Sequence, residues 1–406
     1  MKLNNYIKSD FNLEWLKEPE LKSVWKALSS CGAKVYLVGG CVRNTILGEE
    51  VKDIDIATDM IPDEVIRLSK SKSLKVIPTG ISHGTVMVLS GGKSFDVTTF
   101  RSDLETDGRH AKVRFSTSIE EDARRRDFTM NALYMTIDGD IIDPLCGWKD
   151  LVNGRVKFIG NPVDRINEDY LRILRYFRFL ALYTKTQDNL DITAVAACSS
   201  AAHDLKKLSK ERIWIEIQKL LTAKRPIFAL EAMYSSGVLR EVLPFSNIKK
   251  LENFLMFEIK FNLDCNEINR LIALSYFNNG NWTNDLPLSK KQRNWIILVL
   301  LISKDSYSSR VKGFKYGEFA SLSALAIFGK NLSQRLEKDS LIEIKLGASK
   351  EFPLKTADFL KYFKPSKELG EEVKRLKDIW FESNLGIKRK ELLIELKTYN
   401  RQQNFK

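Results

Sequence analysis

The hydrophobic pattern of the chain changes once, near Pro162, and this change limits the folds that the sequence can adopt. Before it, short β-branched runs alternate with glycines, as in KVYLVGG, KDIDIAT, SLKVIPTG, GTVMVLSGG, KSFDVTTF and GDIIDPLCG, which is typical of strands and turns. After it, apolar residues recur at helical spacing, as in YLRILRYFRFLALY. The sequence therefore predicts an α+β protein, with a sheet in the first part and about 240 helical residues after it.

The helical part contains three breaks in its apolar pattern, near residues 222–226, 278–287 and 352–353. Prolines and polar residues at these positions are typical of joints between helical segments. Together with the change of pattern, the breaks predict four segments: 1–160, 161–225, 226–352 and 353–406. The last segment is basic, because residues 361–406 hold 12 lysines and arginines against 7 acidic residues. A solvated helix face is the simple alternative for this charge.

Charge and composition narrow the class of protein. The 406 residues include 65 lysines and arginines against 52 acidic residues, and the net charge of +13 favours an acidic partner. The longest apolar run, residues 295–302, is shorter than the roughly 18 to 20 residues that cross a bilayer. Five widely spaced cysteines suit neither a disulfide framework nor a zinc site. We therefore expect a cytoplasmic protein with no membrane partner and no evident obligate protein partner.

Two aspartates, Asp53 and Asp55, lie in an apolar stretch that is expected to form a strand. Side chains two positions apart project from the same face of a strand, and the repulsion between the two carboxylates favours a bound cation. Oxygen ligands at this spacing suit Mg²⁺, which commonly shares its coordination with substrate phosphates. Asp96, in the apolar FDVTTFR stretch, is a candidate third carboxylate. The alternatives are solvent-exposed aspartates and, for Asp96, an ion pair with Arg101.

Glycines and arginines on either side of these aspartates form candidate phosphate contacts. In LVGGCVRN, Gly39 and Gly40 end a strand and begin a helix, so free backbone N–H groups and Arg43 can bind phosphate oxygens. In RRRDFTMNAL, the three arginines at 124–126 need anions nearby, and a triphosphate is a fitting one. The alternatives are a plain tight turn and ion pairs with the acidic residues 120–122, which suit Arg124 better than all three arginines.

The stretch NEDYLRILRYFRF carries a pattern suited to base recognition. Helical spacing places Asp169, Arg172 and Arg175 on roughly one side. A carboxylate accepts from an exocyclic amino group, and a guanidinium donates to a ring nitrogen. Because cytosine and adenine present an amino donor beside a ring acceptor, while uracil and guanine reverse that order, one Asp/Arg pair can select CTP and ATP. The alternative is an ordinary ion pair between residues three positions apart.

The motifs LVGGCVRNTILG, DIDIAT, HGTVMV, FDVTTFR, RRRDFTMNAL, NEDYLRILRYFRF and LSKERIWIEIQKLL follow one another in this order. In this they resemble bacterial class II CCA-adding tRNA nucleotidyltransferases and their poly(A) polymerase relatives, over about residues 33–245. LGEEVKRLKDIWFES is similar to that family's C-terminal helix. The resemblance implies a polymerase-β-like nucleotidyltransferase head with a small mixed sheet (1–160), followed by an all-helical neck (161–225), body (226–352) and RNA-binding tail (353–406).

The resemblance also implies roles for single residues. Asp53 and Asp55 match the metal-binding pair, and Asp96 stands where the family often has a third carboxylate. Nucleotide-binding roles fall on Gly39, Gly40, Arg43, Arg126, Asp127, Asp169, Arg172, Arg175 and Arg178. The implied cofactor is Mg²⁺, and the implied partners are tRNA, CTP and ATP. One departure is Asn44, where the family usually has an aspartate. We expect its loss to remove a support from Arg43 rather than the chemistry.

The predicted function is template-independent addition of CCA to the 3′ end of tRNA, by two-metal-ion nucleotidyl transfer that releases pyrophosphate. His83-Gly84-Thr85 and the loop over residues 103–118, which is not shortened, resemble CCA-adding enzymes more than poly(A) polymerases or partial enzymes. Poly(A), CC-only and A-only addition remain alternatives. A catalytically silent RNA-binding protein is a further alternative, against which the clustered charged residues argue.

Overall fold

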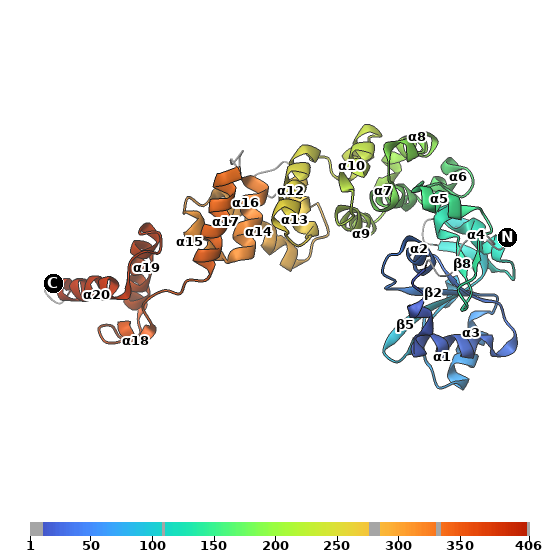
Figure 1. Cartoon of the computed structure of the whole chain (residues 1–406), viewed down its shortest axis with the longest axis horizontal. Coiled ribbons are helices and arrows are strands. Elements are labelled where there is room, and N and C mark those ends of the chain that lie inside the picture. The colour runs from blue at the N-terminus through green and yellow to red at the C-terminus, as the bar shows by residue number, and fades with distance from the viewer. Residues whose placement is uncertain (1–10, 108–109, 276–284, 330–333, 404–406) are drawn as a thin grey trace. The chain divides into compact units, whose positions relative to one another are not determined.

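The protein is described by a computed structural model over residues 11–107, 110–275, 285–329 and 334–403. It divides into two compact units, residues 1–246 and 247–406. Figure 1 shows the strands in the N-terminal part, in blue to cyan, and helices over the rest of the chain. The predicted α+β class, with a mixed sheet followed by helices, is confirmed. The finer division into head, neck, body and tail stays a prediction.

The first unit contains a mixed sheet in the order β3-β4-β5-β2-β1-β8-β9 and a separate ribbon of β6 and β7. Its strands are β1 (Val35–Val38), β2 (Ile54–Thr58), β3 (Lys75–Gly80), β4 (Thr85–Ser90), β5 (Lys93–Thr99), β6 (Arg101–Asp107), β7 (His110–Phe115), β8 (Tyr134–Met135) and β9 (Ile141–Ile142). Only β2 and β5 pair in parallel among the described strands; the other pairs are antiparallel.

The β6–β7 ribbon differs from the loop that the sequence predicts over residues 103–118. The two strands pair antiparallel from Arg101 and Phe115 to Asp107 and His110, and the two residues between them lie outside the described ranges. Backbone hydrogen bonds between β6 and β7 hold the ribbon together outside the main sheet. Such a ribbon needs no alternating apolar pattern, so the sequence did not predict its strands.

Side chains along β2 and β5 alternate between the hydrophobic core and the opposite face of the sheet, which carries the candidate aspartates. Ile54 and Ile56 on β2, with Phe95 and Val97 on β5, are buried. The residues between them face the other way, and the parallel register sets Asp55 directly opposite Asp96. Asp53 precedes the first residue of β2, so the strand predicted to contain both of the first two aspartates begins one residue later.

The helices of the first unit surround this sheet and extend beyond it. They are α1 (Pro19–Leu28), α2 (Gly40–Leu47), α3 (Pro62–Ser71), α4 (Ile119–Arg125), α5 (Gly147–Asn153), α6 (Pro162–Glu168), α7 (Leu171–Tyr183), α8 (Ile192–Ser200), α9 (Lys210–Leu221), α10 (Pro226–Ser235) and α11 (Val238–Val242). Helix α2 begins at Gly40, where the sequence predicts a helix, and α3 has Pro62 in its first turn. Helix α7 packs against α9 and α10.

A break between α6 and α7 corrects the prediction of one helical face through Asp169, Arg172 and Arg175. Asp169 has extended backbone angles, φ −155° and ψ 107°, and its Oδ1 accepts from the backbone N–H of Leu171 at 3.1 Å. A short acidic side chain that bonds to a nearby backbone N–H competes with helix formation. Asp169 therefore stands before the first turn of α7 rather than on its side.

The second unit is helical throughout its described residues. Its helices are α12 (Ile248–Phe261), α13 (Glu267–Leu274), α14 (Lys290–Lys304), α15 (Ser309–Tyr316), α16 (Glu318–Phe328), α17 (Gln334–Ala348), α18 (Thr356–Phe359), α19 (Lys367–Glu382) and α20 (Arg389–Gln403). Helices α15 and α17 approach closely at Gly313 and Gly347, where an added Cβ would overlap the backbone of the facing helix. Within the described ranges, no helix is both long enough and apolar enough to cross a membrane.

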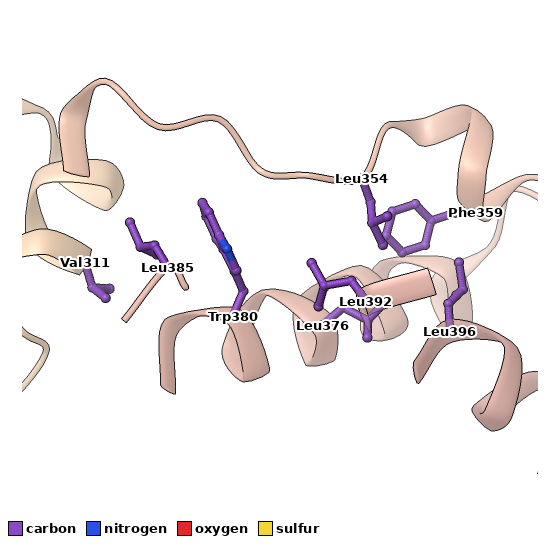
Figure 2. Packing of buried hydrophobic residues seen from close by; sticks show 8 residues of the cluster. All are labelled: Val311, Leu354, Phe359, Leu376, Trp380, Leu385, Leu392 and Leu396. Atoms are coloured by element: carbon purple, nitrogen blue, oxygen red, sulfur yellow. The ribbon is translucent and has the colours of Figure 1, made fainter. Parts of the chain in front are cut away.

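An aromatic and aliphatic core joins the C-terminal helices to α15. Figure 2 shows its buried members, Val311, Leu354, Phe359, Leu376, Trp380, Leu385, Leu392 and Leu396. Trp380 of α19 is fully buried and meets Phe314 of α15 edge to face, with ring centroids 4.9 Å apart. The predicted joint at residues 352–353 is therefore followed by helices that pack back onto the preceding segment.

Candidate active site

A cleft of about 580 Å³ opens in the first unit. It is lined by Gly39, Gly40, Arg43, Asp55, Arg101, Arg125, Arg126, Asp127, Asn131, Asp169, Leu171, Arg172, Arg175, Arg178 and Phe179. Every residue with a predicted nucleotide-binding role is in this set, as is Asp55, whereas Asp53 and Asp96 are not. Arginines outnumber aspartates in the lining, so the cleft suits a polyanion.

The glycine turn contributes Gly39 and Gly40 to the lining of the cleft. Gly39 has φ +73°, which favours glycine, and Gly40 begins α2. A Cβ added at Gly39 would lie 3.8 Å from Nη1 of Arg126, and one added at Gly40 would lie 3.8 Å from Nη2 of Arg43. Larger side chains would fill the space beside both guanidinium groups. The turn thus brings backbone N–H groups and two cations together, as phosphate binding requires.

Arg43 is held from several directions. Its Nη1 donates to Oδ1 of Asn131 at 2.5 Å, and its guanidinium lies over the rings of Phe179 and Tyr183, 5.3 Å and 4.7 Å from their centroids. Its Nη2 donates to Oδ1 of Asn44 at 3.3 Å, while Nδ2 of Asn44 donates to the carbonyl of Glu50 at 2.9 Å. Asn44 therefore replaces a charged partner of Arg43 by a neutral one, and the support that we expected to be lost remains in weaker form.

The arginine triplet differs from the prediction in its ion pairs. Buried Asp122 pairs with both Arg125 and Arg126, at 2.7 Å and 2.9 Å, and also accepts from the hydroxyl of Tyr134 at 2.7 Å. Arg124 is exposed. The acidic neighbour thus serves the two arginines that line the cleft rather than the first one, because the helical turn of α4 brings positions 122, 125 and 126 together.

Asp122 stays ionised in this environment. Burial alone would raise the pKa of its carboxyl, but Arg126 and Arg125 outweigh that effect and hold the pKa well below its usual range. Burial and the carboxylate together raise the pKa of the Tyr134 hydroxyl, although Arg126 lowers it. The buried anion fixes the direction in which Arg126 faces the glycine turn.

Asp55 lines the cleft, and the parallel register of β2 and β5 places Asp96 directly opposite it on the neighbouring strand. Although Asp55 reaches solvent there, the surrounding protein removes enough water to raise its pKa, Asp96 and Asp53 raise it further, and Arg126 and Arg43 lower it. Neighbouring strands lie about 4.8 Å apart, so two carboxylates in register repel unless a cation lies between them. Among the described residues, no group of three or more His, Cys, Asp or Glu side chains is arranged to hold a metal ion alone. Ligands from a bound substrate would have to complete such a site.

The lining of the cleft also includes Asp169 and Arg172, each with a partner that the sequence analysis did not identify. Arg212 of α9 donates to both carboxylate oxygens of Asp169, at 3.2 Å and 2.9 Å. Nη1 of Arg172 donates to Glu168 and to the carbonyl of Arg165. The alternative of an Asp169–Arg172 ion pair is therefore wrong: these two side chains are held separately, each oriented by its own partner.

Arg175 and Arg178, one helical turn apart on α7, are also paired. Arg175 donates Nε and Nη2 to Oδ2 of Asp127 at 2.8 Å and 2.5 Å. Arg178 forms a 3.0 Å ion pair with the buried Glu216 of α9. Burial would raise the pKa of Asp127, yet Arg175 and the hydrogen bond from Asn131 hold it well below its usual range. The salt bridge to Arg175 ties the sheet-containing part to α7.

Five residues of this network were missed as site residues: Asp122, Asn131, Tyr134, Arg212 and Glu216. Three of them stand in motifs quoted for the resemblance: Asn131 in RRRDFTMNAL, and Arg212 and Glu216 in LSKERIWIEIQKLL. Their partners lie 43 residues away for Arg212 and 88 for Asn131, a separation that no local pattern reveals. The only available signal was the presence of polar side chains in apolar stretches, where they need partners.

Sequence comparisons agree with this geometry. A family model described as the Poly A polymerase head domain matches residues 35–157, and one described as the probable RNA and SrmB-binding site of polymerase A matches residues 189–248. The mixed sheet and the helix-lined cleft lie within and between these matches. Together they define a nucleotidyltransferase of the polymerase-β type.

Full-length relatives narrow the class. The chain is 31% identical to the mitochondrial CCA tRNA nucleotidyltransferase 1 of Mus musculus, over 94% of this chain and 92% of the relative. It is 32% identical to the CCA-adding enzyme of Ligilactobacillus salivarius, over 92% and 94%. The crystal structure of the Bacillus stearothermophilus CCA-adding enzyme with CTP shares the fold, with a TM-score of 0.74, 23% identity and coverage of 95% and 99%. The chain belongs to the family of CCA-adding tRNA nucleotidyltransferases and poly(A) polymerases.

Proposed function

We propose that this protein adds CCA to the 3′ end of tRNA, taking CTP and ATP as substrates and releasing pyrophosphate. The observation that supports it most is the match along more than 90% of both chains to relatives named as CCA-adding enzymes. The cleft is chemically consistent with this reaction, because its lining combines the arginines beside the glycine turn, Asp55, and the separately held Asp169 and Arg172.

The triphosphate would lie against the glycine turn. Arg43 and Arg126 flank Gly39 and Gly40 there, so phosphate charge is neutralised by two fixed guanidinium groups. Asp122 and Asn131 already orient these groups, so little rearrangement is needed when the nucleotide binds. Positioning and charge stabilisation are the main contributions of a protein to phosphoryl and nucleotidyl transfer.

Asp53, Asp55 and Asp96 fit divalent metal ions. The raised pKa of Asp55, caused by burial and then by the neighbouring carboxylates, reports a concentration of negative charge that a hard cation such as Mg²⁺ relieves. When bound, the metal supplies activation of the attacking 3′ hydroxyl and stabilisation of the departing pyrophosphate. Asp53 and Asp55 are the proposed ligands, and Asp96 supports them from the adjacent strand.

Base choice would fall to Asp169 and Arg172. Arg212 donates to both carboxylate oxygens of Asp169, and the N–H of Leu171 donates to Oδ1. Oδ2 therefore keeps a lone pair that can accept from an amino group of cytosine or adenine. Arg172 uses three hydrogen bonds to Glu168, Arg165 and Arg125, and a guanidinium has five donors, so it can also donate to a ring nitrogen. Each such contact is worth roughly 1 to 3 kcal/mol of discrimination between bases.

An end-labelling assay on tRNA lacking its CCA end, with CTP and ATP supplied separately and together, tests the proposal. Addition that stops after three nucleotides supports CCA synthesis. Continued addition of A identifies a poly(A) polymerase, and addition from one nucleotide alone identifies a partial enzyme. If no nucleotide is incorporated, the alternative of a catalytically silent RNA-binding protein is favoured.

Variants in the same assay test the site. Asp53→Ala and Asp55→Ala should abolish incorporation, whereas Asp63→Ala, which removes an exposed carboxylate on α3, should not. Asp169→Ala or Arg172→Ala should relax discrimination against UTP and GTP more than it weakens RNA binding. Near wild-type rates in either of the first two variants, or unchanged base selectivity in the last two, would refute the assigned roles.

The five cysteines suit a reducing compartment, and we place the activity in the cytoplasm. Detection of the protein in another compartment by fractionation would contradict this assignment.

A further inference from the structure

Asn131 lies between two groups of the cleft that cannot contact each other directly. It is buried, at 7% exposure, and ends the short 3₁₀ turn Thr129–Asn131. Its Oδ1 accepts from Nη1 of Arg43 at 2.5 Å, and its Nδ2 donates to Oδ1 of Asp127 at 2.8 Å. The side chain thus bridges the glycine-turn arginine and an aspartate that faces α7.

Asp127 continues the connection. Its Oδ1 accepts from Asn131 and from the backbone N–H of Phe128 at 2.8 Å, and its Oδ2 accepts twice from Arg175. Four hydrogen bonds use the usual acceptor capacity of a carboxylate. In this structure Asp127 therefore acts as a bridge to Arg175, with little capacity left for the direct nucleotide contact that the family resemblance implies.

The position of Asn131 requires a side chain that both accepts and donates. A guanidinium has donors only, and an ionised carboxylate has acceptors only, so the group between them must accept at one end and donate at the other. Aspartate would place two carboxylates face to face, and leucine would leave Arg43 and Asp127 without these partners. This requirement also fixes which end of the Asn131 amide is the oxygen.

Arg43 has a second attachment to α7. Its guanidinium lies over Phe179 and Tyr183, at 5.3 Å and 4.7 Å, and both rings project from the helix that carries Arg175. The arginine beside the phosphate-binding turn is therefore positioned by the helix that carries Arg172. A shift of α7 would move Arg43 through both connections.

We propose that Asn131 is a positioning residue that ties Arg43 to α7 through Asp127 and Arg175. A correctly bound base would then fix the position of Arg43, the arginine that holds the triphosphate. The inference rests on the proposed function. It places Asn131 in control of turnover rather than of nucleotide affinity alone, because the connection aligns the triphosphate for attack. A misplacement of about 1 Å in such a group can cost on the order of 100-fold in rate.

A double-mutant cycle tests the connection on the full-length protein. We would measure kcat and KM for CTP incorporation in wild type, Asn131→Ala, Arg175→Ala and the double variant. Each single variant is expected to lose about 10- to 100-fold in kcat/KM, mostly in kcat, and the double variant should lie within about 3-fold of the worse single variant. Asn153→Ala, at an exposed asparagine of the same unit, should match wild type within 2-fold.

The outcomes separate this inference from the proposed function. If the wild-type protein incorporates no nucleotide, the proposed function is refuted. An active wild type with multiplicative losses in the double variant, or with a loss confined to KM, overturns the role of Asn131. If Asn131→Ala fails to fold by circular dichroism, Asn131→Ser enters the same cycle, because a serine hydroxyl keeps one of the two hydrogen bonds. Multiplicative losses in that cycle overturn the inference equally.

Discussion

Replacing Asp122 by asparagine removes one buried charge while keeping the shape of the side chain. In the native protein this carboxylate is 1% exposed and bonds to Arg125, Arg126 and the Tyr134 hydroxyl. The two guanidinium groups are themselves only 15% and 16% exposed. The substitution therefore leaves two largely buried cations without their counter-ion.

The size of the effect follows from the burial. Breaking a buried ion pair by removing one partner costs about 3 to 5 kcal/mol. With a urea m-value of about 3 kcal/mol/M, this corresponds to a fall of roughly 1 to 1.7 M in the unfolding midpoint of the first unit. Activity should fall as well, because Arg126 loses the anion that orients it beside the glycine turn.

Equilibrium urea unfolding of Asp122→Asn against wild type measures the change. Glu121→Gln is the matched control, because its carboxylate is exposed and lies 3.7 Å from the exposed Arg114. Exposed pairs contribute about 0 to 1 kcal/mol, so the control should shift the midpoint little. A shift below about 0.3 M in Asp122→Asn, or one equal to that of the control, would refute the reasoning from burial.

Three further predictions concern stability and RNA binding. An added Cβ at Gly313 would lie 2.1 Å from the carbonyl oxygen of Ile344, so Gly313→Ala should lower the free energy of unfolding by about 1 to 3 kcal/mol. A Cβ added at the helical Gly370 would meet no neighbouring atom, so Gly370→Ala should raise the free energy of unfolding by about 0.5 to 1 kcal/mol. Calorimetric melting checks the sign of both changes. The lowered pKa values of Asp122 and Asp127 mean that their stabilisation is complete above the unfolded-state pKa of about 3.9 and is lost as pH falls below it. Urea midpoints measured from pH 6 to pH 3 should fall in wild type and fall less in Asp122→Asn, and parallel curves would contradict this. Affinity for RNA should decrease with added salt, because the basic helices of residues 353–406 are expected to bind the phosphate backbone; a flat response in filter binding would count against that role.

The order of the elements was predictable because it depends on local patterns. β-Branched runs indicated most strands of the sheet, the paired glycines marked the start of α2, and helical spacing after Pro162 indicated the helical part. The exceptions have physical reasons. The ribbon of β6 and β7 lies outside the sheet and needs no apolar alternation, and the helix predicted through Asp169 is interrupted because its carboxylate bonds to a backbone N–H.

The residue types that suit the chemistry were visible in the sequence as carboxylates two positions apart, paired glycines and clustered arginines, although each of these patterns alone also had a plain structural alternative. Only the tertiary structure decided how these groups are paired. Asp55 faces Asp96 because two strands are parallel and in register, and Asp169 is held by Arg212 rather than by Arg172. Hydrogen bonds and ion pairs depend on distance in space, and folding brings together partners that are far apart in the chain, so their identity could not be derived from local sequence.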